Sequence, residues 1–164
     1  MKIHIIQPMV QDIGLQKAFE TGADEIVFAE GDLYFNEDDY QRVCSADKSV
    51  VTVNRNPILA DKSVALYFDI AGEIRYIYDT GHNELLIKEP FFAIYNSGQV
   101  WKFSDKEIAK KVFSKIDKEE WKGTNLIFVE KYFRTIGRDK YELITLENWV
   151  NCNTLDDFNQ IQEY

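Results

Sequence analysis

Three short segments carry the side chains of this sequence that are best suited to chemistry. The first is Glu30-Gly31-Asp32, which directly follows the apolar run 25–29. In open α/β sheets ligands bind at the carboxyl ends of strands, and a carboxylate placed there after a flexible glycine can reach a phosphate-bound metal. Gly-Asp is also a common turn pair, so an ordinary turn with a solvated Asp32 is the alternative.

The second segment, 149–157, combines the end of a strand with the start of a helix. Thr154 and Asp157 form a capping box, which places Asn153 and Thr154 at a helix N-terminus. The free N–H groups and the helix dipole favour anions at such a position. Ordinary capping explains the same residues, because acidic side chains such as Asp156 also favour the first helical turn.

The third segment places charges and a turn sequence between two apolar strands. Lys88 and Glu89 precede Pro90, and they form either a structural ion pair or the lining of a pocket. The sequence Asn96-Ser97-Gly98 predicts a turn, at which glycine lets the backbone approach a ligand closely.

Other chemistries lack their signatures. His4 and His82 are far apart, which argues against a histidine zinc site, and no G-x-S-x-G nucleophile motif occurs. Nothing in the spacing supports a Cys–His nucleophile pair, although spacing does not exclude one. The two closest glycines, Gly14 and Gly22, are eight positions apart, so the sequence contains neither G-x-G-x-x-G nor a P-loop.

The composition predicts one globular domain, residues 1–164, that is 45% hydrophobic and has 8 glycines and 3 prolines. No apolar run is long enough to cross a membrane. The net charge of −9 argues against nucleic acid as a partner and suits a protein that handles phosphates through Mg²⁺. Cys44 and Cys152 cannot form a disulfide framework, and the apolar start is too short for a secretory leader. We therefore expect a cytoplasmic protein.

The elements that position these segments alternate between helices and strands. We expect strands at 2–7, 25–29, 50–53, 64–68, 74–78, 85–88, 92–96 and 100–103, with a hairpin turn at 69–72. One helix is expected at 12–21, and a second begins at the capping box that Ser104 and Glu107 form. A third is expected at 154–161, with Leu155, Phe158 and Ile161 facing the core. The segment 125–133 allows a strand or a helix. This order predicts an α/β fold with a mixed, mostly parallel sheet and helices on both faces.

Taken in order, these segments resemble the nucleotide-diphospho-sugar transferase superfamily, and the phosphocholine cytidylyltransferase-like nucleotidyltransferases are the branch they resemble most. The resemblance covers roughly residues 24–160 and rests on the order of short motifs. These are the strand end 26–35, the D-x-x-G-x-I hairpin within 64–78, Glu89-Pro90, S-G-x-x-W at 97–101, Tyr141-Glu142 and the segment 149–157.

The resemblance implies transfer of a nucleotidyl group, with CMP expected, from a nucleoside triphosphate to a phosphorylated acceptor such as phosphocholine or a sugar phosphate. It implies that Mg²⁺ is held by Asp32, which resembles the family's first metal-binding carboxylate. The second ligand falls at Asn153, where Asp is usual. An amide oxygen can still bind Mg²⁺, but without charge, which weakens the site.

The resemblance also implies acceptor-binding residues. Glu89 resembles the acceptor-side residue of the family's E-P element, and Ser97 and Gly98 resemble its pocket turn. Aromatic side chains such as Tyr95, Tyr141 or Trp149 could contact a quaternary ammonium, and they are equally good core residues.

The sequence departs from the family at its front, where the family has a Gly-rich, Arg- and Lys-bearing segment that holds the triphosphate. We therefore expect an N-terminally truncated copy of the fold: a fragment, an incomplete gene product, or a chain that a partner completes. A homo-oligomer or other association would cover the exposed sheet edge. Three functions stay open: a nucleotidyltransferase, a catalytically inactive binding or assembly module, and a glycosyltransferase-type domain that binds a nucleotide sugar.

Overall fold

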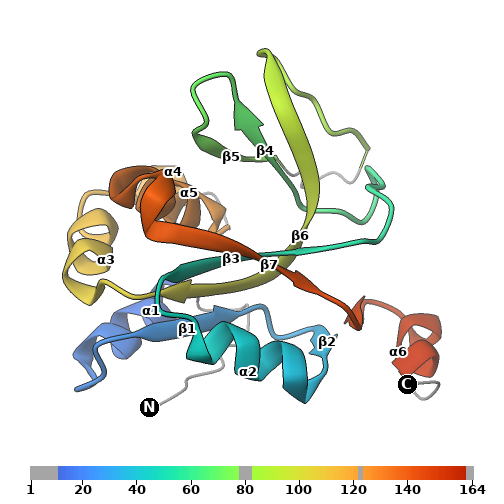
Figure 1. Cartoon of the computed structure of the whole chain (residues 1–164), viewed down its shortest axis with the longest axis horizontal. Coiled ribbons are helices and arrows are strands. Elements are labelled where there is room, and N and C mark those ends of the chain that lie inside the picture. Colours follow the sequence, from blue (N-terminus) through green and yellow to red (C-terminus); the bar gives the residue numbers. More distant parts are fainter. Residues whose placement is uncertain (1–10, 78–82, 122–123, 162–164) are drawn as a thin grey trace.

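The computed structural model describes residues 11–77, 83–121 and 124–161. Its main sheet has six strands, ordered β5-β4-β6-β3-β7, with β1 paired to β6 as well (Figure 1). A separate two-stranded sheet joins β2 to β8. The strands are β1 (Ile26–Ala29), β2 (Leu33–Phe35), β3 (Ser49–Asn54), β4 (Ala65–Asp69), β5 (Ile74–Ile77), β6 (Phe91–Phe103), β7 (Tyr141–Leu146) and β8 (Trp149–Asn151).

The main sheet is mixed, as predicted, but most of its pairs are antiparallel. Among the strands of the described ranges, only β3 and β7 run parallel, whereas β6 is antiparallel to β1, β3 and β4. The prediction of a mostly parallel sheet is therefore wrong. The physical reason lies in the connection from β4 to β5, because a short turn joins them and such a hairpin pairs its strands antiparallel.

Strand β6 is one continuous element of 13 residues, where the sequence predicts two strands and a turn. Ser97 and Gly98, the expected turn, are buried inside it. The irregularity is instead a bulge: the register with β3 shifts between Val51 and Val53, and Gln99 adopts a φ of 54°. The strand expected at 85–88 is not formed, and the one expected at 2–7 lies outside the described residues.

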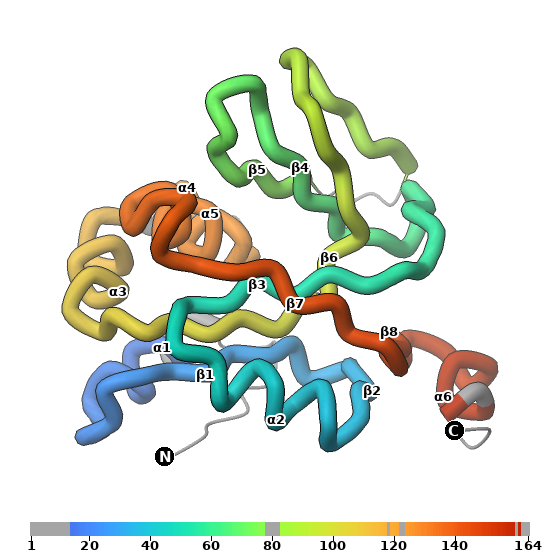
Figure 2. Tube along the Cα trace, in the orientation of Figure 1, coloured from blue at the N-terminus to red at the C-terminus, as the bar shows by residue number. Residues whose placement is uncertain are grey.

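Helices cover both faces of the main sheet, as predicted (Figures 1 and 2). One face packs against α1 (Gln11–Glu20), α3 (Lys106–Phe113) and α5 (Leu126–Ile136), and the other against α2 (Glu37–Ser45). The short elements α4 (Lys118–Trp121), η2 (Arg138–Lys140) and α6 (Leu155–Ile161) complete the described chain. No helix in these ranges is long and apolar enough to cross a membrane.

The main core is aromatic, and Phe128 lies at its centre. This fully buried ring meets Phe19 of α1, Phe103 of β6 and Phe113 of α3 at centroid distances of 6.2, 5.1 and 6.1 Å. Phe128 lies in the segment 125–133, for which the sequence allows either a strand or a helix. The helix α5 forms because apolar side chains recur there at helical spacing and bury one face against the sheet.

Two helix ends differ from expectation. Asp105, not Ser104, caps α3, because its Oδ1 accepts a hydrogen bond from the Ile108 N–H at 2.9 Å. The predicted inward face of α6 is also wrong, since Leu155 is 75% exposed and Phe158 52% exposed. The helix lies beside β8 at the edge of the molecule (Figure 1), so Leu155 and Phe158 find little cover in the described ranges, whereas Ile161 is half-buried.

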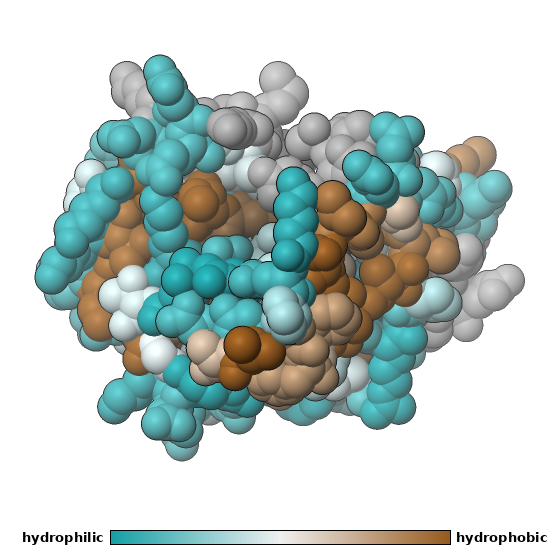
Figure 3. Space-filling view, turned by 90° about the horizontal axis from the view of Figure 1, so that it is seen from above, coloured by the Kyte–Doolittle hydropathy of each residue, from teal (hydrophilic) through white to brown (hydrophobic). Residues whose placement is uncertain are grey.

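Further apolar side chains are exposed at the start of β6, at the end of the molecule that carries the β4–β5 hairpin. Phe91, Phe92, Ile94 and Tyr95 are each at least one-third exposed. Seen from above, this surface is a mixture of hydrophobic and hydrophilic areas (Figure 3). The expected association with another chain would cover such side chains, and it stays a prediction.

Candidate functional site

The turn after β1 lies against the end of β8. Strand β2 pairs with β8 so that Leu33 faces Asn151, and the Asp32 carbonyl oxygen accepts a hydrogen bond from the Cys152 N–H at 2.7 Å. The structure therefore brings together Asp32 and the segment 151–153, which are far apart in the sequence. We call this contact the strand-end junction. It places both predicted metal-ligand positions in one region.

The junction offers one carboxylate and neutral amides. Within the described ranges the Asp32 carboxylate makes no hydrogen bond or ion pair, and Asn153 is exposed. The backbone of Asn153 serves the helix cap, because its N–H donates to Asp157 Oδ2 at 3.1 Å. One carboxylate with an amide oxygen fits a Mg²⁺ ion whose other ligands are phosphates and water. No group of three or more His, Cys, Asp or Glu side chains in the described ranges could hold a metal by itself.

The predicted capping box at the start of α6 is confirmed. Asp157 Oδ2 accepts hydrogen bonds from the Thr154 N–H and hydroxyl, both at 2.8 Å. These bonds lower the pKa of the Asp157 carboxyl. Burial and the nearby Asp157 and Asp32 raise the pKa of the Cys152 thiol, so this cysteine is unsuited to act as a thiolate nucleophile.

Glu30, two residues before Asp32, is a half-buried acid. Burial raises the pKa of its carboxyl, the hydrogen bond that Asn125 Nδ2 donates to its Oε1 at 2.7 Å lowers it, and the Asp32 charge raises it. The net shift is upward. The folded chain therefore holds this proton over a pH range in which the unfolded chain has already released it.

The upward shift of Glu30 predicts a pH-dependent effect of Glu30→Gln. Wild-type stability falls, relative to the variant, as the pH rises above the ordinary value of 4.5, because the folded state must then release a proton that it binds better. The amide still accepts from Asn125. Urea unfolding of both proteins at pH 4, 5.5 and 7 measures the difference. A difference that is constant with pH, or that favours wild type increasingly toward pH 7, contradicts the prediction.

A groove of about 740 Å³ adjoins the junction. The loop between β3 and β4, the middle of β6, strand β8 and the start of α6 line it. The lining is rich in amides, with one cation, two carboxylates and an indole: Asn56, Pro57, Leu59, Asp61, Lys62, Ser63, Asn96, Trp149, Val150, Asn151, Asn153, Thr154 and Asp157.

Two structural features hold the groove wall in place. The Trp149 indole N–H donates to the Gly98 carbonyl at 2.8 Å, which fixes the ring against β6. The buried Asp39 accepts from the Glu147 N–H at 2.8 Å and so orders the turn between β7 and β8. Asp39 is therefore a positioning residue, and no spacing in the sequence marks it.

The bulge of β6 depends on Thr52. Its Oγ1 accepts from the Val100 N–H at 3.1 Å and donates to the Val100 carbonyl at 2.7 Å, replacing backbone bonds that the register shift removes. Gly98 lies directly against this hydroxyl, since a Cβ there would come within 2.5 Å of it. Ser97 is fully buried, and its hydroxyl accepts from the Gln99 N–H at 3.1 Å. Ser97 and Gly98 thus belong to the bulge and the predicted turn is not formed, whereas their role in binding an acceptor stays a prediction.

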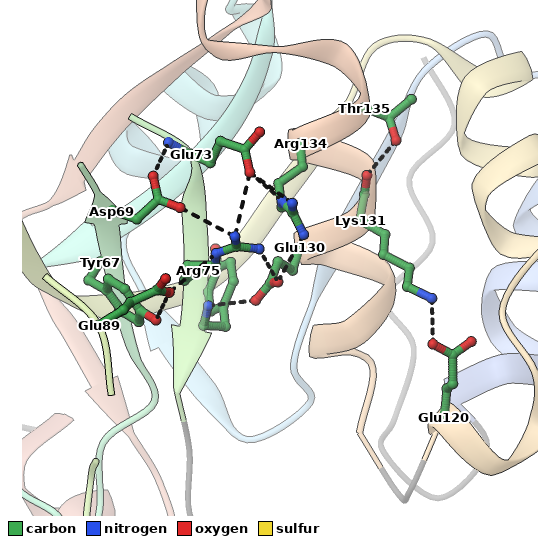
Figure 4. A network of polar contacts seen from close by, with 11 residues as sticks. Tyr67, Asp69, Glu73, Arg75, Glu89, Glu120, Glu130, Lys131, Arg134 and Thr135 are labelled. Carbon is green, nitrogen blue, oxygen red and sulfur yellow. Dashed lines mark hydrogen bonds and ion pairs between the residues drawn. The ribbon is translucent and has the colours of Figure 1, made fainter. Parts of the chain in front are cut away.

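Glu89 belongs to a different cluster, around Arg75 (Figure 4). It accepts a hydrogen bond from the Tyr67 hydroxyl at 2.7 Å, and the Arg75 guanidinium lies 3.6 Å away. Burial and the contact with Glu89 raise the pKa of Tyr67 to about 12. Arg75 also pairs with three other carboxylates from the β4–β5 hairpin and α5, namely Asp69, Glu73 and Glu130, at 3.3 to 3.6 Å.

The predicted acceptor residues are therefore not gathered at the groove. Glu89, Ser97 and Tyr95 do not line it, and Gly98 reaches it only through its bond to Trp149. Tyr95 is 36% exposed and meets Phe68 edge-on at 6.2 Å. The groove residues that sequence reasoning missed are the amides of the β3–β4 loop, β6 and β8. The sequence feature that could have identified these residues is the frequent occurrence of Asn in 54–56 and 151–153.

Solved structures with a similar chain path include two that are named for a nucleotidyltransferase activity. A candidate glucose-1-phosphate thymidylyltransferase from Bacillus anthracis, in complex with sucrose, has a TM-score of 0.60 at 12% identity, covering 93% of this chain and 59% of that chain. The inositol-1-phosphate CTP transferase from T. maritima has a TM-score of 0.55 at 13% identity, covering 97% and 73%. HddC from Yersinia pseudotuberculosis has a TM-score of 0.50 at 14% identity, covering 95% and 62%.

At these identities the likeness shows the fold alone. The chain spans about 59% of the length of the Bacillus anthracis protein. A comparison with curated proteins returns no match. The nucleotidyltransferase-like α/β fold that the sequence suggested is thus confirmed. The model of one family, described as "Domain of unknown function (DUF6564)", matches residues 11–164, and the chain belongs to this family.

Proposed function

We propose that this domain binds a nucleoside triphosphate at the strand-end junction and a phosphorylated small molecule in the adjoining groove, and that it transfers a nucleotidyl group between them. The observation that carries the proposal is the hydrogen bond between Asp32 and Cys152, which sets a carboxylate without a partner among the described residues beside a groove of about 740 Å³. CMP is the group we expect. The fold is the one seen in nucleotidyltransferases.

The proposed reaction joins the acceptor phosphate to the α-phosphorus of the triphosphate. An acceptor phosphate oxygen forms the new P–O bond, the bond from the α-phosphorus to the bridging oxygen breaks, and pyrophosphate leaves with the electron pair. Asp32 and the oxygen of Asn153 would hold Mg²⁺. When bound, this ion would neutralise the charge of the transferring phosphoryl group. Lys62, the cation of the groove lining, would attract the acceptor phosphate.

A second candidate is a binding module that does not catalyse transfer. It is supported by the amides at positions 151 and 153, next to Asp32, which leave the metal position with little charge. The described ranges also hold no acidic group of three that could bind a metal by itself. A domain of this kind would still bind the small molecule in the groove.

Asp32→Ala tests the junction. We expect it to weaken Mg²⁺-dependent CTP binding at least tenfold, because it removes the only charge that Asp32 and Asn153 can offer the ion. The matched control is Asp139→Ala, which removes an equally charged, exposed side chain at η2. Calorimetry of CTP with and without Mg²⁺ measures the effect.

The outcomes separate the two candidates. Pyrophosphate release that requires CTP, Mg²⁺ and a phosphorylated acceptor supports transfer. Nucleotide binding without release from any triphosphate supports the binding module and contradicts transfer. Two results contradict a role of the junction in nucleotide binding: no binding of CTP or any other triphosphate, or wild-type affinity for CTP in both Asp32→Ala and Asp139→Ala.

A further inference from the structure

The groove wall contains buried polar atoms without partners. In the described ranges, four buried side-chain atoms have no hydrogen-bond partner, and two of them belong to residues that line this groove: Asn96 Oδ1 and Asn151 Oδ1. Native proteins satisfy the large majority of buried polar groups. Two such atoms on residues of one groove therefore leave hydrogen-bonding capacity that a ligand can use.

Asn96 shows which kind of atom is unpaired. The residue is only 5% exposed. Its Nδ2 donates to the carbonyls of Asn56 and Pro57 at 3.4 and 3.2 Å. Because two carbonyls face the nitrogen, the opposite end of the amide is the oxygen. The unpaired atom is a hydrogen-bond acceptor.

Asn151 supplies the second acceptor from the other sheet. It ends β8, opposite Leu33 and next to the strand-end junction. Its Oδ1 is buried without a partner. Asn96 comes from β6 of the main sheet, so the two residues line the groove from independent elements.

Some groups of the remaining lining are already hydrogen-bonded within the protein. The Trp149 N–H is bound to Gly98, and Asp157 already accepts from Asn153 and Thr154. The charged side chains of the lining, Asp61, Asp157 and Lys62, sum to a net charge of −1. A phosphate, which carries only acceptors when ionised, would be repelled by two carbonyl oxygens. A group with N–H or O–H donors would satisfy them.

We infer that Asn96 and Asn151 form an acceptor pair that selects a ligand bearing a primary ammonium or hydroxyl group and discriminates against a quaternary ammonium. The inference rests on the proposed function, since it describes the end of the acceptor molecule that is not phosphorylated. It narrows the acceptor class, because choline has no N–H to donate and its ammonium methyl groups would leave both oxygens unpaired.

Both residues line the groove, and each buried oxygen can reach a ligand there if its amide turns. The last torsion of an asparagine side chain is broad, so a small rotation moves the oxygen at little cost. The bonds that hold Asn96 Nδ2 are long, at 3.2 and 3.4 Å, and yield readily.

The test compares phosphoethanolamine with phosphocholine, which differ only in the three methyl groups on nitrogen. Glycerol 3-phosphate serves as the hydroxyl-bearing probe. Calorimetry on the full chain, in EDTA and without nucleotide, keeps the metal position out of the measurement. We expect phosphoethanolamine, glycerol 3-phosphate or both to bind at least tenfold more tightly than phosphocholine, which is about the effect of one lost hydrogen bond.

Variants assign the effect to the two amides. Asn151→Leu and Asn96→Leu should each weaken the preferred probe about tenfold and leave phosphocholine binding unchanged, whereas Asn159→Leu, an exposed amide on α6, changes neither. Asn151→Leu keeps the test open if Asn96→Leu fails to fold. Asn151→Asp distinguishes the two donors, because the added charge strengthens ammonium binding far more than hydroxyl binding.

Three results would overturn the inference: phosphocholine binding as tightly as the donor-bearing probes, no binding of any of the three probes, or equal effects of Asn151→Leu and Asn159→Leu. None of these depends on CTP binding, which tests the proposed function separately. If the chain does not bind CTP but still prefers the donor-bearing probes, the proposed nucleotidyl transfer is contradicted and the inference about the acceptor pair is supported.

Discussion

Replacing Gly98 by alanine should lower the free energy of unfolding by about 3 kcal/mol. A Cβ at this position would lie 2.5 Å from Thr52 Oγ1, 2.8 Å from Thr52 Cβ and 2.9 Å from Leu146 Cδ1. All three distances are shorter than carbon and oxygen atoms tolerate. Thr52 cannot move away, because its hydroxyl bridges the N–H and carbonyl of Val100 across the bulge.

The matched control for Gly98→Ala is Gly22→Ala. A Cβ on Gly22 meets nothing within 4 Å, and its backbone requires no positive φ. We expect this change to alter the stability by less than about 0.5 kcal/mol. Urea unfolding followed by far-UV circular dichroism measures both variants. Equal stabilities would show that the β3–β6 contact is looser than the bulge geometry requires.

Phe128→Ala should cost about 3 to 5 kcal/mol, the range for a fully buried phenylalanine. Its ring contacts α1, α3 and β6 through edge-on aromatic pairs, so the deletion opens a cavity at the meeting point of two helices and the sheet. A domain with ordinary stability retains little margin after such a loss. We expect the variant to be largely unfolded at 37 °C.

Phe158→Ala is the control for Phe128→Ala. Phe158 lies on α6 and is 52% exposed, so its removal should change the stability by less than about 0.5 kcal/mol. Thermal unfolding by calorimetry compares the two proteins. If Phe158→Ala costs as much as Phe128→Ala, the apolar face of α6 is covered in solution, as the sequence pattern suggested.

Local signals predicted local structure well. The capping box of Thr154 and Asp157, the hairpin around 69–72 and the position of Asp32 at the end of a buried strand all follow from a few neighbouring residues. Each depends on backbone donors and on side-chain alternation within one segment. Such patterns can be read without knowing what lies across the fold.

Long-range packing decided the features that the sequence did not predict. Asn96-Ser97-Gly98 has the composition of a turn, but Thr52, more than 40 positions earlier, supplies the bonds that let the strand continue through a bulge. Glu89 follows Lys88 directly in the sequence, but its ion-pair partner is Arg75, which lies near it only once the chain has folded. The acceptor pair joins two strands from different sheets, and no spacing in the chain links them.

The length of β6 has a consequence for how the molecule opens. Its inner part, Val100–Phe103, is held on both sides by β1 and β3, whereas in the described ranges its outer part, Phe91–Tyr95, is paired with β4 alone. One strand therefore belongs to two cooperative units with different opening free energies. Amide protons of the outer part exchange with solvent while the inner part stays closed, and Asn96 stands at the boundary between the two.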